Sequence, residues 1–259
     1  MNILLAFKVE PDLSMLTEAD WRAAAKSNQP PDPSLMRKIM GNDEQGAAEL
    51  MLLTRDGDPT LHLSAITLGD ESATPMLRYL AAVGFERLVR LAYQKDTRFI
   101  PALVAEQIAH YVAQHPVDLI VLGRQSSEGQ NGQTGWLLAE MLGWPCLTAV
   151  TTLVSWSLGF DVQCECIDVH QHWRLEQPAV LVVQNRGQMA LRVPTMRARL
   201  AAAKADLSCI TANITEEAPV QCQSLVRQPY RRAGIIIEGK SVQEKAQRLW
   251  HDYLALRMR

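Results

Sequence analysis

The chain has 259 residues, a formal net charge of −2 and an apolar fraction of 47%. This composition supports a sizeable hydrophobic core and excludes a globally disordered, collagenous or disulfide-stapled chain. A chain so close to neutral has no bulk positive charge for nucleic acid, so we expect no nucleic-acid partner.

The cysteines and the apolar runs bear on the compartment. An odd number of cysteines without a C-x-x-C pair favours a reduced setting. The opening run from Met1 to Lys8 is short and has no basic leader, and no stretch approaches the roughly 18 apolar residues of a membrane span. We therefore expect a cytoplasmic protein with no membrane span. The five cysteines are Cys146, Cys164, Cys166, Cys209 and Cys222.

The first half of the chain alternates predicted strands with predicted helices. Between residues 10 and 42 four prolines predict a long loop with a short helix. The alternation predicts βαβ units and a parallel sheet, whose ligands bind beyond the carboxyl ends of the strands. The loops after Lys8, Gly69 and Gly123 are therefore the first candidates for a site. Strands are predicted at 3–9, 61–68, 88–91 and 118–123, and helices at 43–53, 72–83, 100–115 and 133–142.

The pattern changes after Pro145. Four short segments, at 148–155, 160–168, 170–175 and 179–184, read as strands joined by tight turns, which predicts an antiparallel addition. A helix is predicted over 194–207. Residues 210–240 have few signals for a packed element, and such a long irregular run favours an arm that lies on a partner.

The end of the chain predicts a helix. Ser241 and Glu244 form an S-x-x-E capping box. Helical spacing then places apolar side chains on a single stripe that suits partner docking. The stripe consists of Val242, Ala246, Leu249, Tyr253 and Leu256.

Together these elements predict a doubly wound α/β fold. Its sheet is mostly parallel and Rossmann-like, with an antiparallel addition and a C-terminal docking arm and helix. We assign the α/β domain to residues 1–190 and the docking extension to residues 191–259.

The segment from Gly123 to Gly135 is the most informative in the chain. Its four glycines allow close approach of a ligand or a positive φ, and its hydroxyl and amide side chains offer neutral hydrogen bonds. The unpaired N–H groups that open the following helix favour an anion, to which Arg124 could add a charge-assisted contact. The pattern predicts a main-chain cradle for phosphate or pyrophosphate. An ordinary polar loop is the alternative, since neither a P-loop nor a G-x-G-x-x-G signature is present.

Around this loop the chain resembles the beta, or small, subunit of electron transfer flavoproteins. Residues 118–120 and 131–135 are similar to the family's "DL...G.QS.D...GQTG" stretch. Further similarity lies at Lys8 with Pro11-Asp12, and at 77–85, 138–145 and 178–180. Residues 191–196 resemble the family's recognition loop. The shared order and spacing of these stretches identify the chain as a divergent member.

The resemblance implies a fold, a role and partners. The role is that of an electron-carrier subunit rather than an enzyme. An alpha subunit would hold most of the FAD contacts, and a flavin dehydrogenase or oxidoreductase would supply electrons. This chain would hold AMP or, as in electron-bifurcating members, a second FAD, and the two stay open.

The resemblance also carries over individual residues. Ala6 and the stretch from Met40 to Asp43 would border the adenine and ribose, and Leu68 would pack beside them. Pro194, Thr195 and Met196 match the loop that docks on dehydrogenases. The family's "NPFDE" reads Met40 to Glu44 here. The cofactor-binding residues implied in this way are Ala6, Met40, Gly41, Asn42, Asp43, Leu68, Gly123, Arg124, Gln125, Ser126, Gly129, Asn131, Gly132, Gln133 and Thr134.

Two other functions fit a nucleotide-binding α/β domain. A non-redox adenine-nucleotide-binding module of the stress-protein type would need neither the arm nor the terminal helix. An adenylyl-transfer enzyme would need an S-G-G-x-D-S-like loop after the first strand, which residues 8–12 do not supply.

The segment from residue 164 to residue 172 also contains residue types that can bind a metal. Alternate positions between 164 and 172 carry cysteine, aspartate and histidine, but a turn near Val169 would split that face. We predict no metal site and no catalytic residue.

Overall fold

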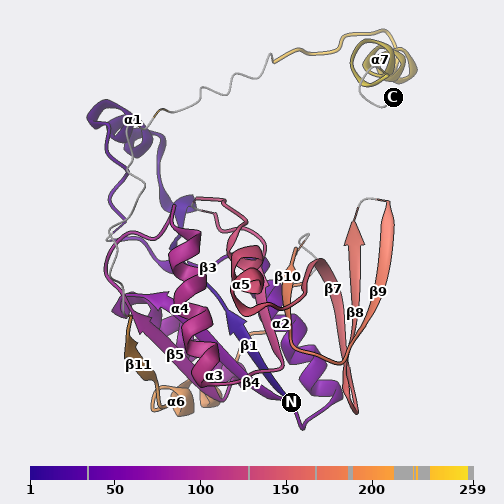
Figure 1. Ribbon diagram of the computed structural model, residues 1–259. Coiled ribbons are helices and arrows are strands. Elements are labelled where there is room, and N and C mark those ends of the chain that lie inside the picture. The colour runs from indigo at the N-terminus through magenta and orange to yellow at the C-terminus, as the bar shows by residue number, and fades with distance from the viewer. Residues whose placement is uncertain are drawn as a thin grey trace. The chain divides into compact units, whose positions relative to one another are not determined.

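The structure is a computed structural model, and it describes residues 1–33, 35–127, 129–166, 168–185, 189–212, 224, 226 and 234–255. The chain divides into two units (Figure 1). The first contains residues 1–17 and 32–223, and the second contains residues 18–31 and 224–259.

The first unit contains the sheet and the helices that cover it. Its strands are β1 (Asn2–Ala6), β2 (Val9–Pro11), β3 (Lys38–Met40), β4 (His62–Gly69), β5 (Arg87–Ala92), β6 (Leu119–Gly123), β7 (Cys146–Trp156), β8 (Gly159–Cys166), β9 (Val169–Leu175), β10 (Ala179–Val183) and β11 (Ser208–Thr211). Its α-helices are α2 (Asn42–Gly57), α3 (Thr74–Val83), α4 (Pro101–Gln114), α5 (Thr134–Leu142) and α6 (Met196–Ala202), with short 3-10 turns at Leu13–Met15 and Glu71–Ala73.

In the part of the chain that the structure describes, nine strands form the main sheet in the order β11-β5-β4-β1-β6-β10-β7-β8-β9. Neighbouring strands are parallel from β11 to β7, and β8 is antiparallel to both β7 and β9. The predicted fold class, a mostly parallel α/β sheet with an antiparallel addition, is confirmed.

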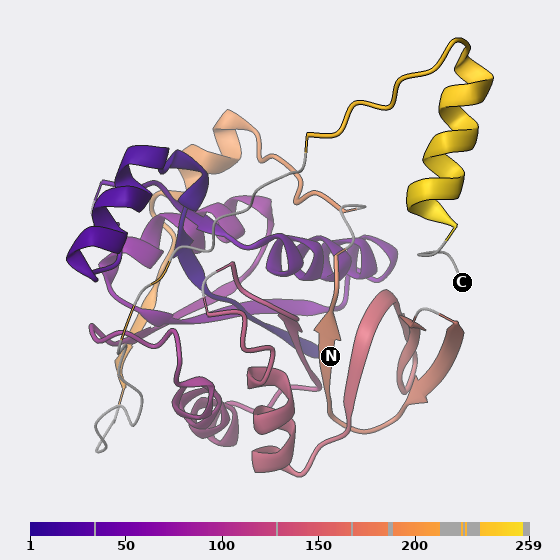
Figure 2. The same cartoon turned by 90° about the horizontal axis from the view of Figure 1, so that it is seen from above.

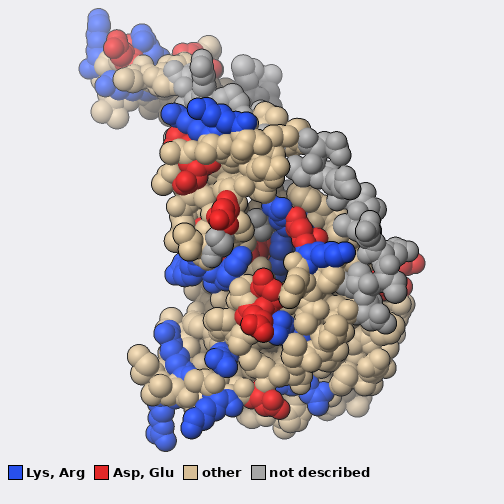
Figure 3. Space-filling view, turned by 90° about the vertical axis from the view of Figure 1, so that its left-hand side faces the viewer, with Lys and Arg blue, Asp and Glu red and all other residues tan. Residues whose placement is uncertain are grey.

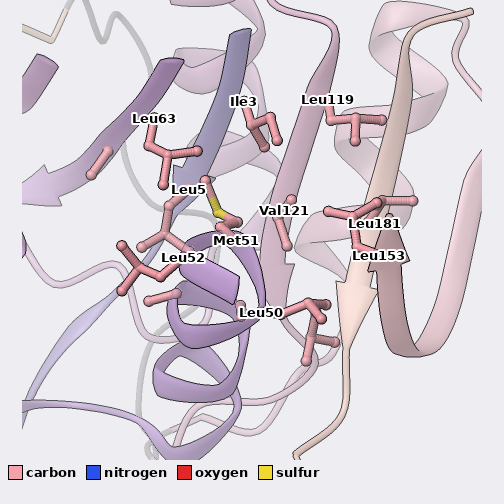
Figure 4. Packing of buried hydrophobic residues seen from close by; sticks show 14 of the residues in the cluster. Ile3, Leu5, Leu50, Met51, Leu52, Leu63, Leu119, Val121, Leu153 and Leu181 are labelled. Carbon is pink, nitrogen blue, oxygen red and sulfur yellow. The ribbon is translucent and has the colours of Figure 1, made fainter. Parts of the chain in front are cut away.

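Helices cover both faces of the parallel strands, as Figure 2 shows for α2 and α3 on one side and α4 and α5 on the other. Successive side chains of a strand point to opposite faces, so Ile3 and Leu5 pack toward α2 while Leu4 packs toward α4. Figure 4 shows Ile3 and Leu5 with Met51 on the α2 side. Burial on both faces explains why β1 is a continuous apolar run.

One predicted pairing is wrong. We expected residues 179–184 to extend the antiparallel addition, whereas β10 returns to the middle of the sheet and pairs in parallel with both β6 and β7. All five residues of β10 are buried. Such a strand needs a neighbour on each side and helices on both faces, and an edge position would leave it exposed.

Other element boundaries also differ from expectation. The predicted strand at 3–9 is two strands, because β2 pairs with β3 in a separate antiparallel ladder inside the expected loop. The helix expected at 194–207 is the shorter α6, which begins where the Thr195 hydroxyl accepts a hydrogen bond from the Ala198 N–H at 3.2 Å. Strand β11, in a region without predicted elements, pairs in parallel with β5. Its four side chains are exposed, so no apolar pattern signals it.

The second unit contains α1 (Glu18–Ser27) and α7 (Val242–Leu249), which a π-helical turn at Trp250–Leu254 extends. The serine half of the predicted capping box is confirmed, since the Ser241 hydroxyl accepts from the Glu244 N–H at 3.1 Å. The Glu244 side chain accepts instead from the Lys240 N–H, at 2.8 Å. Val242 is 79% exposed, and no residue of α7 is buried. The predicted stripe residue Leu256 lies outside the described residues. Within the described ranges, no helix is long and apolar enough to span a bilayer.

Candidate functional site

A pocket lies beyond the carboxyl ends of β1, β4 and β6. Ala6 ends β1, Leu68 stands next to last in β4, and Gly123 ends β6, and all three line the pocket. Thr134 lines it as the first residue of α5. The pocket encloses about 840 Å³ of empty space, including solvent at its mouth. This is the place where open parallel sheets bind their ligands.

About half of the predicted cofactor-binding residues meet in this pocket. They come from three separate strand ends and from the loop before α5, so the fold brings together segments that are far apart in the chain. The predicted residues that line the pocket are Ala6, Leu68, Gly123, Arg124, Ser126, Asn131, Gly132 and Thr134. The lining does not include Met40, Gly41, Asn42, Asp43, Gln125, Gly129 or Gln133.

The loop before α5 owes its shape to backbone conformations that favour glycine. Gly129 and Gly132 have φ values of +78° and +64°. A Cβ on Gly129 would also collide with the carbonyl oxygen of Arg98. The Asn131 side-chain amide donates to that same carbonyl at 2.7 Å. These contacts hold the loop against the connection between β5 and α4.

The start of α5 lies unusually close to β10. A Cβ on Gly135 would stand 2.6 Å from Cγ2 of Val182, so a larger residue would push the helix away from the sheet. The N–H groups of the first turn have no partner within the helix. Together with the helix dipole they make the wall beside Thr134 suitable for an anion.

The predicted residues around the start of α2 are not part of the pocket lining. Asp43 accepts hydrogen bonds from the N–H groups of Asn185, at 2.8 Å, and of Gln125, at 3.2 Å. Asn42 donates from its side-chain amide to the Asn185 carbonyl at 2.9 Å. Met40 is a core residue and Gly41 caps α2. These residues tie the pocket loop to the end of β10, and a contact with a nucleotide stays a prediction for them.

The pocket also contains residues that were not predicted. Lys8 marks one of the strand ends at which the rule for parallel sheets predicts a site, and Thr97 and Arg98 follow β5, whose end the same rule could have added. Glu44 is the last residue of the family-like stretch at 40–44 and follows the predicted cofactor-binding residues directly. Apart from Phe7, which follows β1, the apolar members come from helices and strands and could not be singled out from other core residues. The remaining lining residues are Phe7, Pro101, Val104, Ile108, Leu122, Gly135 and Val182.

A buried carboxyl stands out in the electrostatics of the pocket. Glu44 is 5% exposed, and burial raises its pKa to about 8. A hydrogen bond from the backbone N–H of Glu44 itself opposes this rise in the pKa, the negative charges of Glu10 and Asp43 add to it, and Lys8 opposes it more weakly. Among the described residues, Oε2 of Glu44 has no hydrogen-bond partner.

Its neighbour Glu10 is fully buried, and among the described residues its Oε1 likewise has no hydrogen-bond partner. It accepts from the Ser127 N–H at 2.8 Å and from the Ser127 hydroxyl, and Lys8 Nζ lies 3.6 Å from its other oxygen. One main-chain donor of the loop is therefore already taken by a carboxylate of the protein itself. The face of the molecule in Figure 3 likewise mixes basic and acidic side chains, in keeping with the net charge of −2.

A second surface of interest is the docking segment, by which we mean residues 191–200. The Arg192 guanidinium bonds to Glu49 at 2.8 Å and to Asp56 at 2.8 Å, and its backbone N–H donates to Glu49 at 2.9 Å. The Arg192 carbonyl accepts from the Tyr79 hydroxyl at 3.1 Å. The segment is thus fixed to both α2 and α3.

Beyond this anchor the docking segment presents apolar side chains to solvent. Val193 is 76% exposed, Met196 70% and Leu200 67%. Of the predicted docking residues, Thr195 and Met196 are exposed and Pro194 is buried.

The cysteine and histidine residues of the β8–β9 hairpin do not form a metal site. His170 pairs across the ladder with Glu165 and His172 with Gln163. Directly paired residues share a face, so both histidines lie on the face opposite Cys164. In the part of the chain that the structure describes, no three histidine, cysteine or acidic residues gather as metal ligands would.

Comparisons with known proteins agree with the resemblance. A family model described as the electron transfer flavoprotein domain matches residues 53–214. One relative is YgcR of Escherichia coli K12, which is provisionally named as an electron transfer flavoprotein subunit. It is 48% identical to this chain over 259 residues, which is 100% of this chain and 99% of YgcR.

Two further relatives are more distant. The mitochondrial electron transfer flavoprotein subunit beta of Oryza sativa subsp. japonica is 26% identical over 211 residues, which is 80% of this chain and 82% of the rice protein. CarD, a subunit of the caffeyl-CoA reductase–Etf complex of Acetobacterium woodii, is 30% identical over 116 residues, or 43% of each chain.

Proposed function

Since the chain belongs to the electron transfer flavoprotein family, as a beta-type electron-carrier subunit rather than an enzyme, we propose that it binds an adenine nucleotide in this pocket. We further propose that it pairs with an FAD-bearing alpha subunit. One observation supports nucleotide binding above the others: the ends of β1, β4 and β6 and the start of α5 converge on a single pocket.

The lining residues fit an adenylate group. Leu68, Val104 and Ile108 offer an apolar wall for a planar base. The first turn of α5 and the side chains of Asn131 and Thr134 offer hydrogen-bond donors for a phosphate. Basic side chains of Lys8, Arg98 and Arg124 also line the pocket and complement an anion.

Two nucleotides share this chemistry. AMP and the adenylate half of a second FAD present the same base, ribose and phosphate, so the lining suits either. The flavin of the complex supplies the electron-transfer chemistry. The residues of this chain bind and orient the adenylate and keep water from it.

The docking segment supports a contact with an electron donor. Exposed apolar side chains on a rigid backbone are typical of protein interfaces. By its name, the relative CarD belongs to a complex with a reductase. We propose that Thr195, Met196 and their neighbours contact a flavin dehydrogenase or oxidoreductase. The cytoplasmic location stays a prediction.

The test of this function is co-expression with a candidate alpha chain from the same organism, followed by mass spectrometry of the nucleotides that the purified complex releases. We expect a yellow heterodimer that contains AMP, or FAD beyond one equivalent. A colourless homodimer that retains ATP would contradict the proposal and favour the stress-protein alternative.

A matched pair of variants locates the nucleotide. Gly132 and Gly143 have nearly equal φ values, +64° and +65°, so valine imposes a similar backbone strain at either position. Gly132 lines the pocket and Gly143 does not. We expect Gly132→Val to lose the nucleotide and Gly143→Val to keep it. Equal retention by both variants would argue against this pocket.

A further inference from the structure

The proposed function uses the donors and basic side chains of the pocket, but it leaves one lining group unexplained. Glu44 reaches the pocket from the first turn of α2 and is 5% exposed. Among the residues described, its Oε2 has no hydrogen-bond partner. A buried carboxylate oxygen without a partner costs free energy, and protonation of the carboxyl lowers this cost. The neutral carboxyl that results brings to the pocket lining an O–H that a ligand oxygen can accept.

The backbone around Glu44 is shaped to admit this carboxyl. A Cβ on Gly123 would stand 2.9 Å from Cδ of Glu44, and a Cβ on Gly41 would collide with Oε2. Two glycines from distant parts of the chain thus flank one carboxyl group. Gly41 occupies the position where the "NPFDE" pattern has proline, so the space beside Oε2 coincides with the departure of this chain from that pattern.

The charges facing Glu44 do not compensate an ionised carboxylate. The acids Glu10 and Asp43 oppose its ionisation. Lys8 favours it, but Lys8 Nζ lies 3.6 Å from Glu10. Two arginines line the same pocket, and one of them, Arg98, already forms an ion pair with Asp96 at 2.7 Å. The charged groups that act on the pKa of Glu44 are Asp43 of the same helix and Lys8 and Glu10 of the neighbouring segment, and Arg98 and Arg124 line the same pocket.

We propose that Glu44 is a ligand-contacting residue that remains protonated in the nucleotide complex and donates its O–H to an oxygen of the adenylate. This inference rests on the proposed function for the identity of the ligand. A neutral carboxyl has a donor for an anionic ligand, whereas a carboxylate has acceptors alone and would repel phosphate inside a site shielded from water. Nucleotide binding is therefore coupled to proton binding at this side chain.

The structure sets the pH range of this coupling. The pKa of Glu44 in the free protein is raised to about 8 by burial, so the carboxyl is largely protonated at neutral pH. Affinity for the nucleotide should be highest below that pKa and fall as pH rises through it, by up to about tenfold per pH unit. A phosphate monoester has its own second pKa near about 6, so measurements from about pH 7 upward isolate the contribution of the protein.

The experiment is a calorimetric titration of the full chain with AMP, and in parallel with FAD, from about pH 7 to about pH 9.5. We expect the affinity of the wild type to fall with pH and proton uptake to accompany binding at the alkaline end. Glu44→Gln keeps a neutral hydrogen-bond donor, so its affinity should be independent of pH. Glu140→Gln removes a charge from exposed α5 surface outside the pocket and should behave like the wild type.

A spectroscopic readout separates a ligand contact from a merely structural role. The infrared difference spectrum between the AMP complex and the free chain at the alkaline end should gain the band of a protonated carboxyl, and Glu44→Gln should lack that gain. Nucleotide binding that does not vary with pH, or a pH dependence that persists in Glu44→Gln, overturns this inference and leaves the proposed function intact. Absence of AMP and FAD binding at every pH overturns both.

Discussion

At the scale of single residues, the shape of the pocket depends on glycines, which have no side chain. A Cβ on Gly123 would stand 2.8 Å from the backbone nitrogen of Glu44, and a Cβ on Gly135 would press on Val182. A Cβ on Gly132 would meet only ordinary van der Waals contacts, the nearest at 3.5 Å from Cγ of Gln125, but the φ of Gly132 is positive. These glycines serve two purposes, close packing of backbone and a left-handed conformation. The sequence shows that glycines are present, but it does not show which purpose each one serves.

The pKa of Glu44 leads to a prediction about stability without any ligand. Its folded-state value of about 8 lies above the ordinary value of 4.5, so the folded chain binds more protons than the unfolded chain between these values. The contribution of Glu44 to the free energy of unfolding is fully present below about pH 4.5. It decreases by on the order of 4 kcal/mol as the pH rises to about 8. Glu44→Gln cannot lose this contribution. We therefore expect its unfolding free energy minus that of the wild type to increase by on the order of 4 kcal/mol between pH 5 and pH 8.

Urea unfolding across this pH range measures the difference, with Glu140→Gln as the control for loss of a charge. Other titrating groups cancel in the comparison because they are common to both proteins. A difference between wild type and Glu44→Gln that is the same at both ends of the range would show that Glu44 is not protonated in the folded chain.

At the scale of elements, the docking segment shows how side-chain contacts can order the loop that leads into a helix, here α6. Arg192 joins it to α2 through Glu49 and Asp56, and to α3 through Tyr79. The side chain of Glu49 is 12% exposed, so its charge depends on this partner. The apolar side chains beyond the anchor are thereby held out in solvent in a defined position, which lowers the entropy lost on docking.

We expect Arg192→Ala to lower the free energy of unfolding by about 2 kcal/mol, because it leaves the Glu49 carboxylate nearly buried without its partner. Affinity for the electron donor should fall as well, since the docking segment loses its anchor. Arg174→Ala is the matched control, because its ion pair with Asp161 is exposed on both sides and should cost less than about 1 kcal/mol. Equal losses in urea unfolding for the two variants would refute the anchoring role.

At the scale of the whole molecule, the chain separates a unit that carries the pocket from a unit that carries the terminal helix. Every residue that lines the pocket belongs to the first unit. In the second unit, α7 is capped and amphipathic, yet none of its residues is buried. A helix of eight residues is marginal by itself, so we interpret its apolar stripe as a surface for the alpha subunit.

Ending the chain at residue 223 tests this division. We expect the shortened chain to bind AMP with unchanged affinity, because the pocket is complete without residues 224–259. Size-exclusion chromatography with the alpha chain should show loss of the heterodimer. Co-elution of the shortened chain with the alpha chain would place the main interface elsewhere, and loss of AMP binding would show that the two units are not independent.

The sequence by itself determined the features that depend on neighbours in the chain. Apolar periodicity predicted most helices and parallel strands, Ser241 and Glu244 predicted the cap of α7, and the glycines between 123 and 135 predicted the pocket loop. Each of these signals acts over a few residues, so a linear reading can detect it.

Tertiary structure alone decided the features that depend on residues far apart. It placed β10 between β6 and β7, because a strand buried on both faces needs the middle of the sheet. It also decided that the carboxyl of Glu44 lies beside Gly41 and Gly123 and that Arg98 lines the pocket. The charge state of that carboxyl follows from burial among distant segments, and burial is a property of the folded chain rather than of any local pattern.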